Sequence, residues 1–363
     1  MKRSQLVHWP LLFVTLAILT IGLINLYSAS EAGTSANRPY FLSQLLWSGV
    51  AVVAALVAYL IDYRIYERLA YIFYGLVVLA LVAVFFTRSI GGSHRWLDLG
   101  FFNLQPSELM KIVIVTALAR FFHHDMAPRE GYGIKRLIKP FAITGLPIIL
   151  ILLEPDLGTA LMIGMIAATV ILFVKVRLKT IAALVLLILI ALPITWQFVL
   201  KDYQKKRVMT MVDPESDPRG SGYHRRQSII AIGSGQFSGK GFRNGTQTQL
   251  RFLPEQHTDF IFSVWAEEQG FVGSISLLIL YAAMILSGLH IASKAREKFG
   301  ALLCLGLTAV IFCQMTVNIG MVLGLLPVVG VTLPFMSYGG TSLVISIMSV
   351  ALMLNIYSRR HMF

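Results

Sequence analysis

Ten apolar stretches constrain this chain of 363 residues more than any other feature. A helix needs about 20 mostly apolar residues to cross the hydrocarbon core of a bilayer. The stretches cover residues 9–28, 41–61, 69–87, 107–123, 140–153, 158–174, 180–200, 258–290, 300–326 and 334–357. Charged residues make up only 13% of the chain, about half their share in a soluble domain. The sequence therefore predicts an all-α polytopic integral membrane protein with ten transmembrane helices, and it excludes a soluble fold.

Lysine and arginine are unevenly divided between the two sides that ten helices would create. With the N-terminus inside, the inner segments hold 17 of these residues, whereas the short outer loops hold only Arg38, Arg88 and Arg95. Cytoplasmic loops of membrane proteins are enriched in Lys and Arg. We therefore expect both termini on the cytoplasmic side of a cell membrane.

The long loop at about residues 201–257 departs from this bias, with ten basic against five acidic residues. A loop of this length can be translocated with little regard to its charge. Alternatively, its positive charge collects an anionic ligand at the outer surface, such as phosphate on a lipid carrier. Its glycines at 233, 235, 239 and 241 either let the backbone approach a ligand or belong to a flexible loop that packs on helix ends.

Three acids near the start of the stretch 258–290 indicate a site. Asp259, Glu267 and Glu268 lie there, and an acid at the centre of a membrane helix costs about 2.5 to 3.5 kcal/mol. As one helix, residues 260–291 would measure about 48 Å against a bilayer core of about 30 Å. We therefore expect Asp259 at the level of the outer headgroups, and Glu267 and Glu268 deeper, as structural partners of basic residues.

Other polar residues fall at the predicted outer ends of helices. Glu108 and Lys111 are three residues apart, so they can pair either in a functional site or in a structural salt bridge between helices. Asp156, just before 158–174, either caps that helix or contacts a substrate. The Gly- and Pro-rich junction that contains Ser337 favours close helix packing over ligand contact. Since all these residues map to outer helix ends, we expect a site that faces outward.

Several motifs together resemble the SEDS family of RodA, FtsW and SpoVE. They are residues 213–218, 233–235, 239–241, 252–262 and 337–340, and residues 95–100 and 245–247 resemble the RodA branch. The resemblance spans nearly the whole chain. It implies a single SEDS-type transmembrane domain over residues 1–363, in a bacterial cytoplasmic membrane.

The same resemblance implies a peptidoglycan glycosyltransferase that polymerises lipid II, with Asp259 as the catalytic aspartate. Trp96, Glu108, Lys111 and Asp156 match positions that family members need for function, and neighbouring Arg95 and Ser337 are counted with them as substrate-binding candidates. A cognate class B penicillin-binding protein is the implied partner. It would supply the transpeptidase within the elongation machinery that sets cell shape.

The chemistry agrees with this site. A lipid pyrophosphate is a good leaving group, so one base, for which Asp259 is the candidate, suffices to take the proton from the attacking hydroxyl. The charge on the departing pyrophosphate needs a cation, for which we consider Lys111, Lys240, Arg243 and a divalent ion such as Mg or Mn. The alternatives are a lipid II flippase, a scaffold that only recruits a partner, and an FtsW-like division polymerase.

Overall fold

The computed structural model describes residues 7–30, 39–87, 95–98, 100, 103–126, 128, 130–199, 202–213, 217, 220–253 and 255–360. Parts of the predicted motifs, at residues 91–94, 99, 214–216, 218 and 254, lie outside the described residues.

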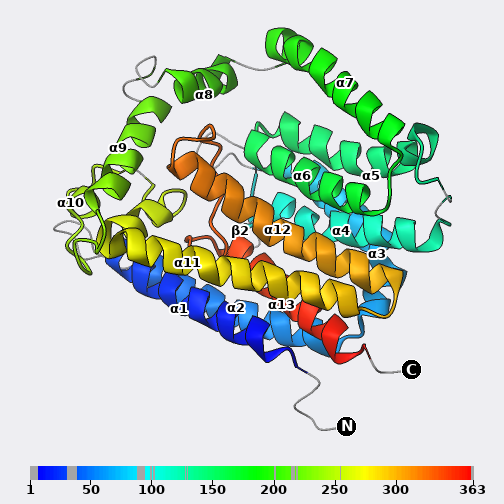
Figure 1. The fold of residues 1–363 in the computed structure, drawn as a ribbon, viewed down its shortest axis with the longest axis horizontal. Helices are drawn as coiled ribbons and strands as arrows, with labels where there is room; N and C mark the ends of the chain where they lie inside the picture. Colours follow the sequence, from blue (N-terminus) through cyan, green and yellow to red (C-terminus); the bar gives the residue numbers. More distant parts are fainter. Residues whose placement is uncertain are drawn as a thin grey trace.

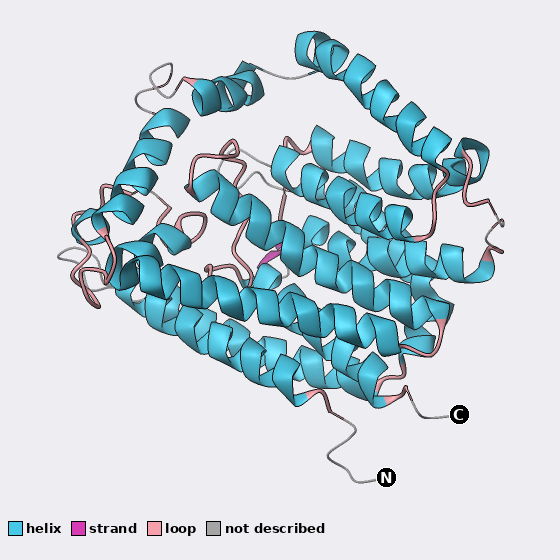
Figure 2. Cartoon of the chain, viewed as in Figure 1, coloured by secondary structure: helices cyan, strands magenta, loops and turns pink. Residues whose placement is uncertain are grey.

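The described part of the chain is almost entirely helical (Figure 2), and ten of its helices coincide with the ten predicted stretches (Figure 1). They are α1 (Trp9–Ser30), α2 (Pro39–Leu60), α3 (Tyr63–Val84), α4 (Pro106–His124), α5 (Ile134–Leu153), α6 (Leu157–Phe173), α7 (Leu178–Ile194), α11 (Ile261–Lys294), α12 (Lys298–Val322) and α13 (Gly340–Ser358). Eight of these are long and apolar enough to cross a membrane. The other two are α6, with 17 residues, and α4, which contains Glu108, Lys111 and Arg120. The predicted all-α polytopic fold is confirmed.

The connections carry further structure. The π-helical segment Thr195–Val199 extends α7, and the long loop folds into α8 (Asp202–Val212), α9 (Ser221–Ser234) and α10 (Thr246–Gln249). Between α3 and α4, β1 (Leu97–Asp98) pairs antiparallel with β2 (Asn103–Leu104). Helix α5 begins six residues before the predicted stretch 140–153, because its first turns are polar although helical.

Helices α12 and α13 form the core of the bundle. Helix α12 packs against α4, α6 and α11, and α13 packs against α2 (Figure 1). Helix α7 lies apart from the other long helices, and Thr180 is its only buried residue. Its aliphatic side chains are exposed on all faces, as expected for a helix surrounded by lipid.

Helix α11 is broken at Gly270, where the backbone adopts φ 64° and ψ −160°. This conformation is essentially restricted to glycine. The amides of Phe271 and Val272 donate to the carbonyls of Gln236 (2.9 Å) and Phe237 (3.2 Å) in the loop after α9, instead of continuing the helix. The Trp265 indole donates to the carbonyl of Gly273, 2.9 Å away and eight residues on, so the chain reverses at the break.

The glycine-rich loop completes the hydrogen bonds of the broken helix from the other side. The amides of Lys240 and Gly241 donate to the carbonyls of Glu267 (3.1 Å) and Glu268 (2.9 Å). Gly239 and Gly241 take positive φ, and a side chain at Gly239 would overlap the Glu268 carbonyl. Of the two explanations for these glycines, the structure supports packing on a helix end.

The reversal inverts the expected order of the acids. Asn25 of α1 donates to the carbonyl of Ile261 (2.9 Å), and Ser28, one turn nearer the loop end of α1, donates to the Glu268 carboxylate. The first half of α11 therefore runs beside α1 in the same direction, toward the C-terminal end of α1, and Asp259 lies just before the start of this half. The expectation of one 48 Å helix with Asp259 above Glu267 and Glu268 was wrong, since it assumed unbroken helical hydrogen bonding through Gly270.

Candidate active site

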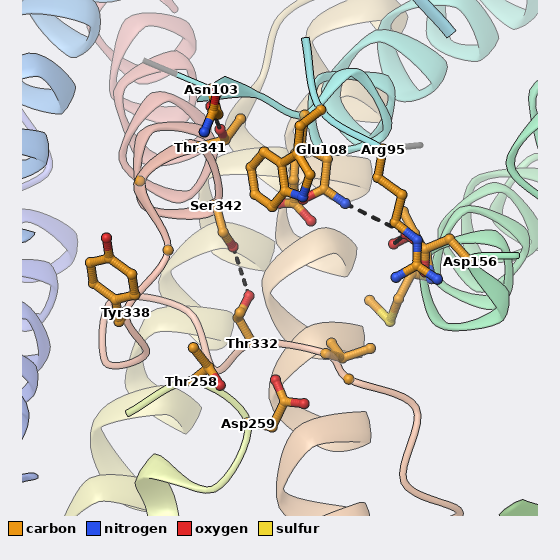
Figure 3. Close-up of a pocket in the computed structure, with 18 of the residues that line it drawn as sticks. Arg95, Asn103, Glu108, Asp156, Thr258, Asp259, Thr332, Tyr338, Thr341 and Ser342 are labelled. Atoms are coloured by element: carbon orange, nitrogen blue, oxygen red, sulfur yellow. Dashed lines mark hydrogen bonds between the residues drawn. The ribbon is translucent and has the colours of Figure 1, made fainter. Parts of the chain in front are cut away.

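A cavity of about 1310 Å³ lies among α2, α4, α6 and the segments that lead into α11 and α13. Six of the nine predicted site residues line it, namely Arg95, Trp96, Glu108, Lys111, Asp156 and Asp259. Figure 3 shows Asp259 and Thr258 at one end, and Arg95, Glu108 and Asp156 at the other. Segments separated by more than 100 residues in the sequence thus contribute to one site.

The N-terminal ends of four helices converge on this cavity. Its lining includes Gln105 and Asp156, the N-caps of α4 and α6, and Gly339, the N-cap of α13. Asp259 lies immediately before Phe260, the N-cap of α11. Because unpaired amides and the helix dipole make a helix N-terminus electropositive, this arrangement favours an anionic ligand.

The loop that carries Asp259 is held by buried polar side chains. Asn318 of α12 donates to the carbonyls of Asp259 (2.9 Å) and Val331 (2.7 Å). Ser337 donates to the carbonyl of Thr258 (2.6 Å) and accepts the amide of Leu333 (2.8 Å). Ser337 therefore lies behind the cavity wall and positions the loop. It was predicted to bind substrate, but it is not among the residues that line the cavity.

The α12–α13 junction also shapes the cavity beside Asp259. Gly330 has φ 73°, and a Cβ there would lie 3.4 Å from Asp259 Oδ2. Thr332 and Ser342 share a hydrogen bond of 2.8 Å on the same wall (Figure 3). Close packing alone was favoured for this junction, and the structure shows that its glycines line the cavity as well.

Asp259 lies outside the membrane-spanning helices, in the loop before α11. Burial and the nearby negative charge of Glu255 raise its pKa to about 6, and the positive charge of Arg207 opposes this shift. At neutral pH the carboxylate is therefore mostly ionised, and it is a stronger base than an ordinary aspartate.

The opposite wall holds a buried ion pair and a helix cap. Lys111 Nζ lies 2.6 Å from Glu108 Oε1 within α4, so the pair lines the cavity and does not join two helices. Asp156 accepts hydrogen bonds from the amide (3.2 Å) and hydroxyl (2.8 Å) of Thr159. The predicted cap is confirmed, and the same residue lines the cavity.

Arg95 brings positive charge to this wall. Its guanidinium donates to the carbonyls of Glu154 (3.3 Å) and Pro155. Burial, then the neighbouring Asp156, raise the pKa of Glu154 to about 8. At neutral pH Glu154 is therefore protonated, and it adds little negative charge near Arg95.

Lys240 and Arg243 do not line the cavity. Lys240 Nζ lies 2.7 Å from the fully buried Glu267 carboxylate, which also accepts the amides of Gln247 (2.9 Å) and Thr248 (3.2 Å). Arg243 interacts with Glu268. The expected pairing with a basic residue is confirmed for Glu267, whereas Glu268 accepts a hydrogen bond from Ser28 and lies near the charge of Arg243. Both bases lie at the broken helix and outside the cavity.

Two charged lining residues, Arg207 of α8 and Glu255, were not predicted as site residues. The only sequence signal for Arg207 was its place among the ten bases of the long loop. Tyr338, within the motif at 337–340, also lines the cavity, as does Trp47, which had no signal in the sequence.

Within the described residues, no group of three or more His, Cys, Asp or Glu side chains is placed to hold a metal ion. Four of the described carboxylates line the cavity, and two of them, Glu108 and Asp156, are already engaged by Lys111 and Thr159. The described side chains therefore do not fit a metal site made by protein alone. A divalent cation here would need oxygen atoms from a bound phosphate ligand.

Comparison with known proteins agrees with the fold and the site. Residues 9–362 match the model of the FtsW, RodA and SpoVE family, described as cell cycle proteins. The chain belongs to this family. MrdB of Escherichia coli, a peptidoglycan glycosyltransferase, is 40% identical over 355 residues, which cover 97% of this chain and 94% of MrdB. Stage V sporulation protein E of Bacillus subtilis is 36% identical over 96% of this chain and 97% of the relative.

Solved structures of family members superpose over nearly the full length. One solved chain is 30% identical and superposes with a TM-score of 0.84 over 98% of this chain and 99% of that chain. It comes from a peptidoglycan synthase complex that coordinates polymerization and crosslinking. The rod shape-determining protein RodA of Thermus thermophilus is 27% identical, with a TM-score of 0.73 over 98% of both chains. This family member is therefore a multi-pass membrane protein and a homologue of peptidoglycan glycosyltransferases.

Proposed function

We propose that the chain polymerises lipid II into glycan strands at the outer face of the bacterial cytoplasmic membrane, as a RodA-like enzyme of cell elongation. The homology to MrdB supports the reaction class. The observation that carries the proposal is the cavity itself, in which a carboxylate with a pKa of about 6 shares the lining with Arg95, Lys111, Arg207 and the N-terminal ends of helices.

In the proposed reaction, Asp259 takes the proton from an acceptor sugar hydroxyl as that oxygen attacks C1 of the donor sugar. The bond between C1 and the pyrophosphate oxygen breaks, and undecaprenyl pyrophosphate leaves with the electron pair. Because pyrophosphate is a good leaving group, no second carboxylate is needed as an acid. The proton that Asp259 has accepted then passes to solvent.

The developing negative charge would be stabilised by Arg207, Arg95 and Lys111, together with the helix N-termini. Arg207 takes the role first given to Lys240 and Arg243, because it lines the cavity and interacts electrostatically with Asp259. A divalent cation bound with the pyrophosphate stays a prediction, and no step above depends on it.

The proposal includes both termini in the cytoplasm and one SEDS-type domain, with residues 201–257 outside the membrane. It also includes a class B penicillin-binding protein as crosslinking partner. The solved structure whose description couples polymerization with crosslinking supports that partner.

The test is polymerisation of purified lipid II, resolved by glycan length, with and without EDTA. We expect glycan strands from the wild type and from Glu130→Gln, an exposed acid outside the cavity. We expect none from Asp259→Asn or Asp259→Ala. Intact polymerisation by Asp259→Asn would exclude Asp259 as the base.

Two further measurements separate the alternatives. Translocation of labelled lipid II in reconstituted vesicles without strand formation would identify a flippase. Depletion in a rod-shaped cell should give round cells if the chain serves elongation, whereas filaments would indicate a division polymerase like FtsW.

A further inference from the structure

A second cavity, of about 410 Å³, lies where α3 begins, α4 ends and the chain enters α12. Its lining consists entirely of charged and histidine side chains: Arg64, Glu67, Arg68, Arg120, His123, His124 and Glu297. Its volume falls within the range of about 300 to 1,000 Å³ that is typical of small-molecule sites. No step of the proposed reaction uses these residues.

This inner cavity lies at the end of the bundle that holds both termini. Arg359, at the C-terminal end of α13, donates to the carbonyl of Leu60 (2.8 Å) and pairs with Asp62, the N-cap of α3 (3.4 Å). Figure 1 shows the start of α1 and the end of α13 on this side, opposite α9 and α10. The cavity is therefore separate from the candidate active site.

Both acids of the inner cavity already have partners. Glu297 pairs with Arg64 at 2.6 Å. Glu67 lies 3.6 Å from His123 Nε2 and 3.1 Å from His124 Nε2. Among the described residues, neither carboxylate forms an ion pair with the other two arginines, Arg68 and Arg120.

Arg68 and Arg120 have no carboxylate within ion-pair distance among the described residues. Arg120 donates to the backbone carbonyl of Arg68, and its guanidinium lies over the Tyr71 ring at 4.7 Å. These contacts orient Arg120 and leave its charge uncompensated. His123 adds a buried Nδ1 atom with no hydrogen-bond partner in the described structure.

We propose that this inner cavity binds a phosphate group on an anionic ligand, through Arg68 and Arg120. The planar guanidinium donates paired N–H bonds that match phosphate oxygens. Exposed Ile65, Tyr71 and Ile72 flank it on α3, so the acyl chains of an anionic phospholipid would have an apolar surface beside the headgroup. A soluble phosphate compound would use the same two arginines.

The test uses the full chain in phosphatidylcholine nanodiscs and measures the thermal midpoint. One arm titrates inorganic phosphate, and the other replaces part of the phosphatidylcholine with phosphatidylglycerol. We expect at least one probe to raise the midpoint of the wild type. In Arg68→Gln/Arg120→Gln, about tenfold or more of the probe should be needed for the same rise in midpoint, because two charge-assisted contacts are lost.

The control is Lys135→Gln/Lys139→Gln, which removes two exposed charges of α5 outside the cavity and should respond like the wild type. Arg68→Gln is also tested alone, as a variant that should fold normally. The described structure shows no hydrogen bond or ion pair from the Arg68 side chain, so its loss should not disturb the fold. A response to phosphatidylglycerol only identifies a lipid headgroup, and a response to inorganic phosphate identifies a soluble ligand. If neither probe acts on the wild type, or if both double variants respond equally, the proposal is refuted.

Discussion

Glu255 and Arg207 act on the pKa of Asp259 in opposite directions, which gives a prediction for the pH dependence of polymerisation. With that pKa at about 6, about one tenth of the carboxyl is ionised at pH 5 and about nine tenths at pH 7. If Asp259 is the base, the rate per enzyme should therefore fall about tenfold between the high-pH plateau and pH 5.

The fall in rate toward low pH is the acid limb of the pH–rate profile. Removing Glu255 and removing Arg207 should shift this limb in opposite directions. Glu255→Gln removes a negative charge, so the pKa of Asp259 falls and the limb moves to lower pH. Arg207→Gln removes a positive charge, so the limb moves to higher pH. The Glu255 side chain is 59% exposed and its field is screened by solvent, so we expect its shift to be about half a pH unit or less.

The assay is the initial rate of lipid II polymerisation from pH 5 to pH 9, with Glu130→Gln as the control that leaves the limb in place. Asp259→Asn should be inactive but folded. Because folding raises the pKa of Asp259 from 3.8 to about 6, stability is lost as the pH rises through this range and the loss is complete above it, and an amide at this position removes that cost. Shifts of both variants in the same direction would refute the assignment of the limb to Asp259.

Three structural predictions follow from buried contacts, each measured by thermal or denaturant unfolding. Lys240→Met should destabilise the protein by about 3 kcal/mol or more because it leaves the buried Glu267 carboxylate without its cation. Adding Glu267→Gln should recover part of the loss, and a role of Lys240 in ligand binding only would not produce this recovery. Gly270→Ala should lower the free energy of unfolding by about 2 to 5 kcal/mol, because of backbone strain and overlap with the 236–241 loop. As a control, Gly75→Ala should be neutral or stabilising, since its new Cβ meets no atom within 4 Å. Equal effects of the two substitutions would contradict the break in α11. Lys111→Met should also cost about 3 kcal/mol or more, since it leaves Glu108 buried without its cation, and unchanged stability would show that the pair is not buried in the folded protein.

Local patterns in the sequence were sufficient for the helices and for contacts within one helix. Hydropathy identified all ten long helices, since a helix that faces lipid or the core of the bundle is mostly apolar. The spacing of three residues predicted the Glu108–Lys111 pair, and the position of Asp156 predicted its cap on α6. Each depends on residues a few positions apart, whose geometry a helix fixes.

Tertiary structure alone decided the depth of Asp259 and the partners of Lys240. Both depend on hydrogen bonds between residues 236–241 and the backbone on either side of Gly270, about 30 residues further along the chain. Helical periodicity does not predict such a contact. Hydropathy does not reveal the break either, because both halves of α11 are mostly apolar. The convergence of four helix N-termini and Arg207 on the cavity that holds Asp259 has the same cause: long-range packing brought them together.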